Sequence, residues 1–164
     1  MGQIKAKTQL ERLGFKDVDK KNPKHDEIQI WAYENAEKIL RDTILAEKEF
    51  ELKNRKWERQ IIQGARNSEY KRVVGFIDLE FKYNAEYYNK IGDYNELETR
   101  SLFVEVKTVI PNLGELMRQM NFYRSFLTEY GSKFMVICPD DRYKRIINEQ
   151  GIWFYKYKDP NLLF

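Results

Sequence analysis

The chain has 164 residues, of which 42% are hydrophobic and 34% are charged. This length and composition predict a single globular domain over residues 1–164 whose core needs no disulfide. With one cysteine and one histidine, the chain excludes an internal disulfide and a cysteine-rich zinc site, and Ser–His or Cys–His catalysis would have to use His25. The formal net charge of +3 permits nucleic-acid binding without indicating it.

Targeting segments and domain boundaries leave no trace in the sequence. No apolar run approaches the roughly 20 residues that a membrane span needs, and the N-terminus lacks the apolar segment of a signal peptide. We therefore expect a cytoplasmic protein that does not contact a membrane. There is no internal repeat or low-complexity linker to divide the chain.

The first half of the chain predicts helices followed by strands. A short helix is expected over residues 4–14. Asn22 and Pro23 form a typical helix start, and apolar residues at helical spacing extend the predicted helix to about Leu45. Residues 46–56 are charged and fit either more helix or a loop. Three runs rich in β-branched and aromatic residues then predict strands: Lys56–Gln63, Arg72–Tyr83 and Ser101–Ile110.

The second half of the chain alternates helices with strands. Residues 83–94 are rich in tyrosine, and they fit either a platform for unpaired bases or a hairpin that packs its rings on the sheet. Asn112 as cap and Glu115 at the third helical position predict a helix that Gly131 ends. Three further elements follow: the strand Lys133–Cys138, the helix Asp140–Glu149 and the strand Gly151–Tyr157. The order α, β, β, β, α, β, then α, β predicts an α/β fold.

Two of the predicted strands carry carboxylates in a pattern that suits a metal ion. Because side chains alternate along a strand, Glu105 and Lys107 project from the same face. An antiparallel neighbour carrying Asp78 would place a second carboxylate beside Glu105. Such a pair suits a hard cation such as Mg²⁺, which keeps open positions for water and phosphate. Lys107 would then orient the attacking water or stabilise charge on the phosphoryl group.

A second Glu-x-Lys spacing leaves an alternative open. Glu80 and Lys82 repeat the pattern, and Glu58 would then have to serve as the upstream acid. Strand carboxylates are also commonly solvated surface charges. We favour residues 105–107 because Asp78 precedes them by one strand. Close-set carboxylates repel, so alanine at either favoured acid is expected to maintain or raise the thermal midpoint without metal.

The order of elements, with Gly75-Phe-Ile-Asp78 on one strand and Glu105-Val-Lys107 on the next, resembles the PD-(D/E)XK nuclease superfamily. Gln119 and Tyr123 lie one turn apart on the following helix and so share a face. This Gln-x-x-x-Tyr helix resembles the RecB and lambda-exonuclease branch. The resemblance covers residues 22–138. It implies a restriction-endonuclease-like αβββαβ core with a mixed central sheet flanked by helices.

The resemblance also implies roles for individual residues. Asp78 and Glu105 would be metal ligands, and the Val106 carbonyl a further one. Lys107 would be the catalytic lysine. The helix pair would position substrate and help to hold the site; it consists of Gln119 and Tyr123.

Two positions depart from the pattern or are not fixed by it. Ile77 stands where the motif has proline, a common departure. The family tends to place an acid or a histidine on the first helix, facing the metals. We assign this role to Glu27, with Glu34 as the alternative, and interpret His25 as an exposed residue at the helix start.

As a function, the resemblance implies a deoxyribonuclease that depends on Mg²⁺ or Mn²⁺ and works from DNA ends like an exonuclease. A phage or mobile element is its expected source. One alternative is a structure-selective endonuclease of the junction resolvase type, which would need a dimer. The other is a catalytically idle member of the fold that binds DNA or a protein partner. The intact Asp, Glu and Lys argue against the idle form. The expected partner is DNA, and a homo-oligomer or a larger nucleic-acid-processing complex is compatible with the sequence.

Overall fold

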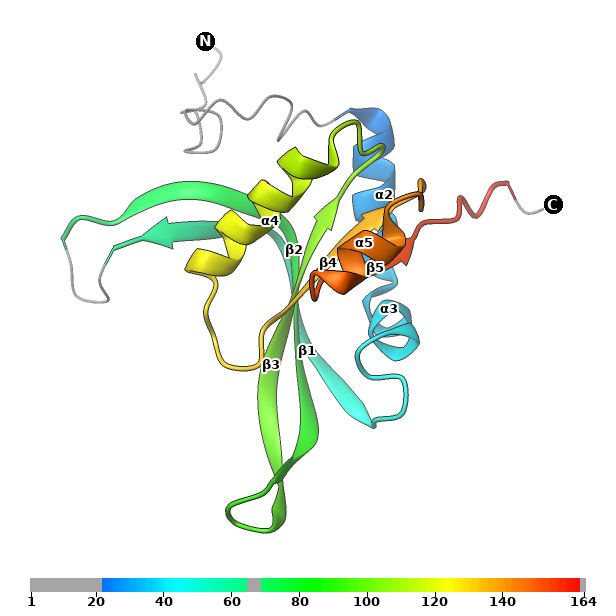
Figure 1. Cartoon of the computed structure of the whole chain (residues 1–164). Helices are drawn as coiled ribbons and strands as arrows, with labels where there is room; N and C mark the ends of the chain where they lie inside the picture. The colour runs from blue at the N-terminus through cyan, green and yellow to red at the C-terminus, as the bar shows by residue number, and fades with distance from the viewer. Residues whose placement is uncertain (1–21, 65–68, 163–164) are drawn as a thin grey trace.

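The computed structural model describes residues 22–64 and 69–162 (Figure 1). The helices are α2 (Pro23–Glu34), α3 (Ala36–Asp42), α4 (Leu113–Phe126) and α5 (Lys144–Glu149). The strands are β1 (Phe50–Gln63), β2 (Arg72–Asn89), β3 (Tyr94–Val106), β4 (Lys133–Cys138) and β5 (Trp153–Lys156). The helix expected over residues 4–14 lies outside the described residues. None of the described helices is long and apolar enough to span a membrane.

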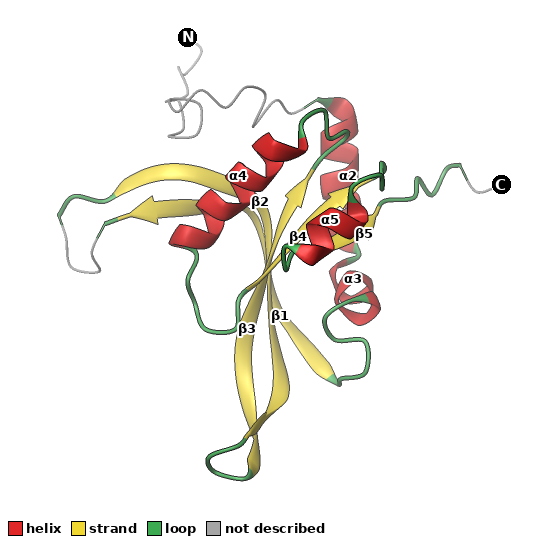
Figure 2. Ribbon diagram, in the orientation of Figure 1, coloured by secondary structure: helices red, strands yellow, loops and turns green. Residues whose placement is uncertain are grey.

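One mixed sheet organises the described chain, with the strand order β1-β2-β3-β4-β5. The pairs β1–β2 and β2–β3 are antiparallel, and β3–β4 and β4–β5 are parallel. Each parallel connection passes through a helix, α4 in the first and α5 in the second, as parallel neighbours require. Helices lie on both sides of the sheet (Figure 2). The predicted α/β architecture with a mixed sheet and the αβββαβ order is thus confirmed.

Each face of the sheet has its own hydrophobic core. The first lies under α4 and α5 and includes Phe103, Met120 and Val136. The second lies under α2 and α3 and includes Ile28, Leu79 and Val104. Val104 and Phe103 are adjacent in β3 and enter opposite cores, because successive side chains of a strand point to opposite faces. The last six residues of β3, 101–106, are therefore buried on both sides, and they include the predicted Glu105.

The prediction of one long first helix reaching Leu45 is wrong, because the helix is interrupted at Asn35. The Asn35 side-chain amide donates to the Trp31 carbonyl at 2.8 Å, next to the bond that its own backbone N–H makes to the same oxygen at 2.9 Å. Asparagine side chains compete with helical hydrogen bonds in this way. Residues 46–56 continue no helix either: β1 begins at Phe50. It is an edge strand exposed on much of both faces, so its sequence is rich in charged residues and does not alternate between apolar and polar residues.

The tyrosine-rich segment extends β2 and β3 into a long hairpin (Figure 1). Tyr83 is buried in the core, and the Arg100 guanidinium carbon lies 3.4 Å from the centre of the Tyr87 ring. Tyr88 and Tyr94 are exposed near the tip. The inner rings thus pack on the sheet as one of the two interpretations expected.

The start of α4 follows the prediction, and its end does not. The Asn112 side chain accepts a hydrogen bond from the Glu115 backbone N–H at 3.1 Å, which is the predicted cap. The helix ends at Phe126, where Leu127 leaves helical geometry with φ −95° and ψ 76°. Gly131 supplies a left-handed turn with φ 74° only after this shorter helix.

Two isoleucines test the core assignment with the same substitution. Ile39 of α3 is fully buried, and Ile91 at the hairpin tip is fully exposed. Ile39→Ala should lower the free energy of unfolding by about 2–5 kcal/mol, because a buried cavity replaces the side chain. Ile91→Ala should change it by less than about 0.5 kcal/mol. Urea denaturation measures both, and equal effects would contradict the assignment of the second core.

Candidate active site

The predicted acids lie where β2 and β3 separate. The strands are paired from the hairpin to Leu79 and Val104, and Asp78 and Glu105 come one step beyond that pair. There the Val106 backbone N–H donates to Asp78 Oδ2 at 2.7 Å, so a side chain takes the place of a backbone acceptor. β3 continues beside β4 while β2 bends away with β1 (Figure 1). We call this point, formed by Asp78 and residues 105–107, the fork.

Glu105 is buried at the fork with two donors at one oxygen. The Lys107 ammonium lies 3.2 Å from Glu105 Oε1, and Gln119 Nε2 donates to the same atom at 3.1 Å. β3 ends at Val106, four residues before the predicted strand end at Ile110. Lys107 follows directly, and its backbone N–H donates to the Ile137 carbonyl at 2.9 Å. The carboxylate and the ammonium are therefore side by side, as the strand alternation predicts.

The Gln-x-x-x-Tyr pair connects the two arms of the fork. Gln119 Nε2 donates to the Tyr123 hydroxyl at 2.8 Å as well as to Glu105, which its two N–H groups allow. The Tyr123 hydroxyl donates to the Phe76 carbonyl on β2 at 3.1 Å. α4 thus ties the Glu105 carboxylate of β3 to the backbone of β2. The structure brings together these predicted residues: Asp78, Glu105, Val106, Lys107, Gln119 and Tyr123.

His25 also belongs to the fork, and its interpretation as an exposed residue is wrong. It is 8% exposed, and its Nε2 lies 3.3 Å from Asp78 Oδ2. The Asn22 side chain accepts the His25 backbone N–H at 2.9 Å and fixes where the helix starts. His25 then shares a buried stripe with Ile28, Gln29 and Ala32. That spacing is the sequence signal that identifies His25 as inward-facing.

The structure does not bring Glu27 to the fork. Its side chain is 44% exposed, and its Oε1 accepts from the Tyr157 hydroxyl at 3.3 Å and lies 3.6 Å from the Lys24 ammonium. Burial, together with the negative charge of Glu27, raises the pKa of the Tyr157 hydroxyl to about 12. The alternative Glu34 is exposed at the end of α2. Of the first-helix candidates considered, His25 is the one that contacts Asp78.

The alternative Glu-x-Lys motif has a different setting. Glu80 is buried with its Oε1 3.6 Å from Arg59 Nε, and Arg59 also bonds Glu129 at 3.2 Å. Lys82 is exposed. Glu58 lies between the residues of β1 that pair with the neighbours of Asp78, and it has a left-handed φ of 53°. Such a φ costs about 1–2 kcal/mol outside glycine. The Glu80 carboxylate is thus paired with Arg59, whereas the first motif faces the fork.

The donor set at the fork fits a hard divalent cation that keeps part of its own hydration. Among the residues that the structure describes, no three His, Cys, Asp or Glu side chains form a complete metal site. The fork offers an imidazole nitrogen and a carboxylate in contact, from His25 and Asp78, and a second carboxylate, Glu105, across the strands. Mg²⁺ commonly binds through one or two carboxylates and retains waters, and imidazole also suits transition metals.

Cys138 lies near the fork on β4 and is not a nucleophile. It is fully buried, and burial raises the pKa of its thiol to about 11. A thiol with such a pKa stays protonated near neutral pH and is unreactive.

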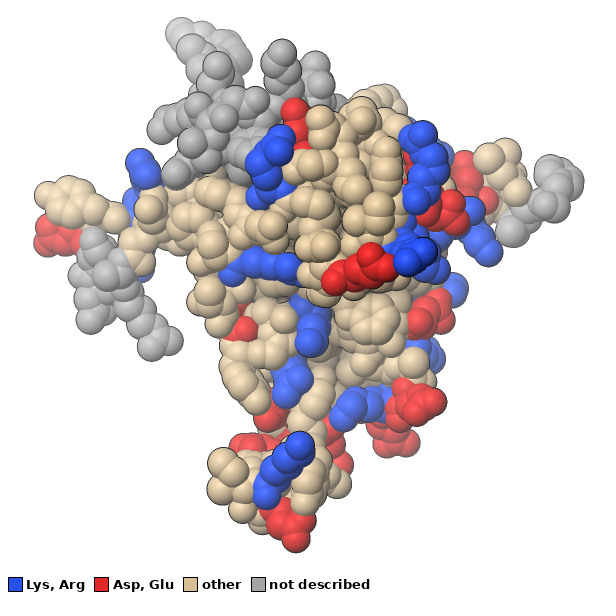
Figure 3. Space-filling model, viewed as in Figure 1, with Lys and Arg blue, Asp and Glu red and all other residues tan. Residues whose placement is uncertain are grey.

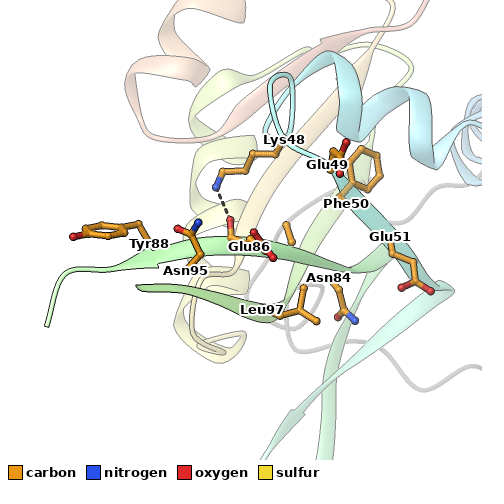
Figure 4. Close-up of a pocket in the computed structure, with 10 residues that line it drawn as sticks. Lys48, Glu49, Phe50, Glu51, Asn84, Glu86, Tyr88, Asn95 and Leu97 are labelled. Carbon is orange, nitrogen blue, oxygen red and sulfur yellow. Dashed lines mark hydrogen bonds between the residues drawn. The ribbon is translucent and has the colours of Figure 1, made fainter. Parts of the chain in front are cut away.

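A hollow of about 650 Å³ lies at the hairpin (Figure 4). Lys48 reaches across it and donates to the Glu86 backbone carbonyl at 2.7 Å. The carboxylates that line it would repel phosphate; they belong to Glu49, Glu51 and Glu86. The fork is therefore the better candidate for chemistry on a phosphodiester.

Comparisons with known proteins find no matching family model and no matching curated protein. Two solved structures are similar. A repair endonuclease from Pyrococcus abyssi shares 18% identity over 77% of this chain and 47% of that chain, with a TM-score of 0.37. EndoMS in its apo form shares 15% identity over 85% of this chain and 48% of that chain, with a TM-score of 0.36. The chain spans about half the length of each.

From the sequence, Asp78→Ala is expected to maintain or raise the thermal midpoint. The hydrogen bond between Asp78 and Val106 predicts the opposite, a loss of stability. Asp78→Ala leaves the Val106 N–H buried without its acceptor, which should cost about 1–3 kcal/mol and outweigh any relief of repulsion between carboxylates. Asp78→Asn keeps an acceptor oxygen and should lose less. Urea denaturation without metal compares the two. An alanine variant as stable as the wild type would show that this hydrogen bond does not hold the fork together.

Proposed function

We propose that the protein is a divalent-metal-dependent nuclease of the restriction-endonuclease-like PD-(D/E)XK type that hydrolyses DNA phosphodiester bonds. The observation that supports this best is the convergence of an acid from β2, an acid and a lysine from the end of β3, and a glutamine from α4. An ion pair made only for stability would not need the second buried acid.

Three side chains of the fork would hold Mg²⁺ or Mn²⁺: His25, Asp78 and Glu105. His25 takes the first-helix role that the sequence assigned to Glu27, and the Val106 carbonyl remains a further proposed ligand. Imidazole binds Mn²⁺ more readily than Mg²⁺, because Mg²⁺ prefers oxygen ligands. A bound cation would supply charge neutralisation on the phosphate and a more acidic attacking water.

Lys107 is suited to act on the phosphate or the water. Its ammonium is held 3.2 Å from Glu105 Oε1 and is mostly buried, with 17% of the side chain exposed. Gln119 holds the same carboxylate oxygen, so Glu105 stays in place as charge develops on the substrate. A preorganised ammonium in a largely buried site stabilises such charge without reorganising.

DNA is the proposed substrate, and we propose that linear DNA enters the site by its ends. The Gln119–Tyr123 helix lies beside the fork, and the branch that it resembles works largely from ends. Lys and Arg side chains on the face that carries α4 are interspersed with acidic ones (Figure 3). Binding should therefore depend on contacts with DNA near the site. The exposed Arg118, which precedes Gln119 on α4, is a proposed contact of this kind.

Metal dependence and the role of Lys107 can be measured together. Linear DNA should be cleaved with Mg²⁺ or Mn²⁺ and remain intact with excess chelator, whereas Ca²⁺ should bind and support little cleavage. Lys107→Ala should lower turnover by about 100-fold or more, because it removes a preorganised charge. Its Mn²⁺ affinity by calorimetry should stay close to that of the wild type. Lys82→Ala, which changes an exposed lysine of β2, is the control.

Undiminished hydrolysis in chelator would remove the metal mechanism. Loss of metal binding in Lys107→Ala would instead assign Lys107 a structural role.

The entry of DNA is tested with circles. Linear duplex or single-stranded DNA should be degraded while covalently closed circles survive. Tyr123→Phe removes the hydroxyl between Gln119 and the Phe76 carbonyl and keeps the buried ring. It should reduce cleavage by about 5- to 30-fold with metal affinity nearly unchanged, since each of the two hydrogen bonds lost contributes about 1 kcal/mol. Closed circles cut as fast as linear DNA would favour the structure-selective endonuclease.

A further inference from the structure

We propose that Gln29 is a positioning residue of the fork: its amide nitrogen holds the backbone at Asp78, and its amide oxygen fixes the orientation of the His25 imidazole. The second half of this proposal rests on the proposed function, because it matters most when His25 is a metal ligand.

The β2 backbone is held at the fork from both faces of the sheet. Gln29 Nε2, from α2, donates to the Asp78 carbonyl at 3.0 Å across 49 residues of sequence. Two residues earlier, the Tyr123 hydroxyl, from α4, donates to the Phe76 carbonyl at 3.1 Å. Both carbonyls lie beyond the last residue of β2 that pairs with β3. Gln29 therefore does for α2 what Tyr123 does for α4.

Two buried polar atoms of α2 remain without a hydrogen-bond partner in the described part of the chain. They are Gln29 Oε1 and His25 Nδ1, and Gln29 is fully buried. Their residues are one helical turn apart and share a face. Asp26 Oδ1 lies 3.9 Å from Nδ1, beyond hydrogen-bond distance, on a side chain that is 54% exposed.

Buried polar atoms of this kind are usually satisfied, and an unmade bond costs about 1–3 kcal/mol. Gln29 Oε1 only accepts, whereas Nδ1 of a neutral imidazole donates or accepts according to the tautomer. A single water between them would satisfy both atoms, as buried waters commonly do.

This arrangement serves both tautomers of His25. Without a cation, Nε2 faces Asp78 Oδ2 at 3.3 Å, and the water would donate one proton to Nδ1 and the other to Gln29 Oε1. When Nε2 binds a cation its lone pair must be free, so the one ring proton resides on Nδ1. Nδ1–H then donates to the water, which still donates to Gln29. Gln29 Oε1 accepts from the water in both states.

His25 is the only histidine in the chain, so the nitrogen NMR signals of its imidazole are unambiguous. We expect the ring proton on Nε2 in the metal-free protein and on Nδ1 after Mg²⁺ is added. In Gln29→Met, the methionine side chain is close to glutamine in volume and cannot make the hydrogen bonds of the amide. It should shift the Nδ1 resonance even without metal and weaken Mg²⁺ binding by about 10- to 100-fold in calorimetry. Gln29→Glu replaces the neutral acceptor with a charged one and should also shift the Nδ1 resonance. Asp26→Asn, the matched control, should leave it in place.

The outcomes separate this proposal from the proposed function. A folded Gln29→Met variant with the wild-type Nδ1 resonance and Mg²⁺ affinity would overturn the role of Gln29, as would a shift produced by Asp26→Asn alone. If Mg²⁺ does not bind the wild type but Gln29→Met still moves the Nδ1 resonance, the positioning role holds and the metal-dependent function fails. Should Gln29→Met unfold, an unchanged Nδ1 resonance in a folded Gln29→Glu would overturn the proposal.

Discussion

The hydrogen bond from the Val106 backbone N–H to Asp78 Oδ2 is the interaction on which the candidate site depends. In a continuous ladder, β2 and β3 would satisfy each other through backbone groups, and their carboxylates would stand on a flat sheet. Here the pairing stops at Leu79 and Val104, and one carboxylate takes over as acceptor. The sheet can open without leaving this N–H unpaired, which would be costly in a buried position. The same bond aims Asp78 across the fork toward the chain that carries Glu105.

Opening a sheet in the core requires partners from outside the sheet. α2 supplies Gln29 to the backbone of β2 on one face, and α4 supplies Tyr123 on the other. Buried carboxylates are stable only when paired or bound to a cation. Glu105 has Lys107 and Gln119, and Asp78 has the Val106 N–H and His25. With two acids and one lysine, the fork retains negative charge that a divalent cation would neutralise.

The sequence was informative where local chemistry decides the structure. The caps at Asn22 and Asn112, the alternation that puts Glu105 beside Lys107, and the one-turn spacing of Gln119 and Tyr123 all act over a few residues. Each of these contacts is present in the structure.

Boundaries and long-range choices were harder to predict. The break at Asn35 depends on one side chain competing with the helix, and β1 has the charged sequence of an edge strand. The choice of Glu27 over His25 failed to anticipate the contact with Asp78 for a similar reason. The two residues lie two positions apart near the start of α2, and only the packing of that helix on the sheet decides which of them faces inward. The helical spacing of His25 with Ile28 and Ala32 favours His25 as the inward-facing residue.

The central claim is that a divalent cation binds at the fork between α2, β2 and β3. Crystals soaked in Mn²⁺ test it most directly, because the anomalous scattering of manganese locates the ion independently of activity. We expect an anomalous peak within bonding distance of Asp78 and Glu105, with His25 Nε2 as a further ligand. Manganese at Glu27 and Tyr157, at the hairpin hollow, or at no ordered position in a crystal that leaves the fork accessible would contradict it.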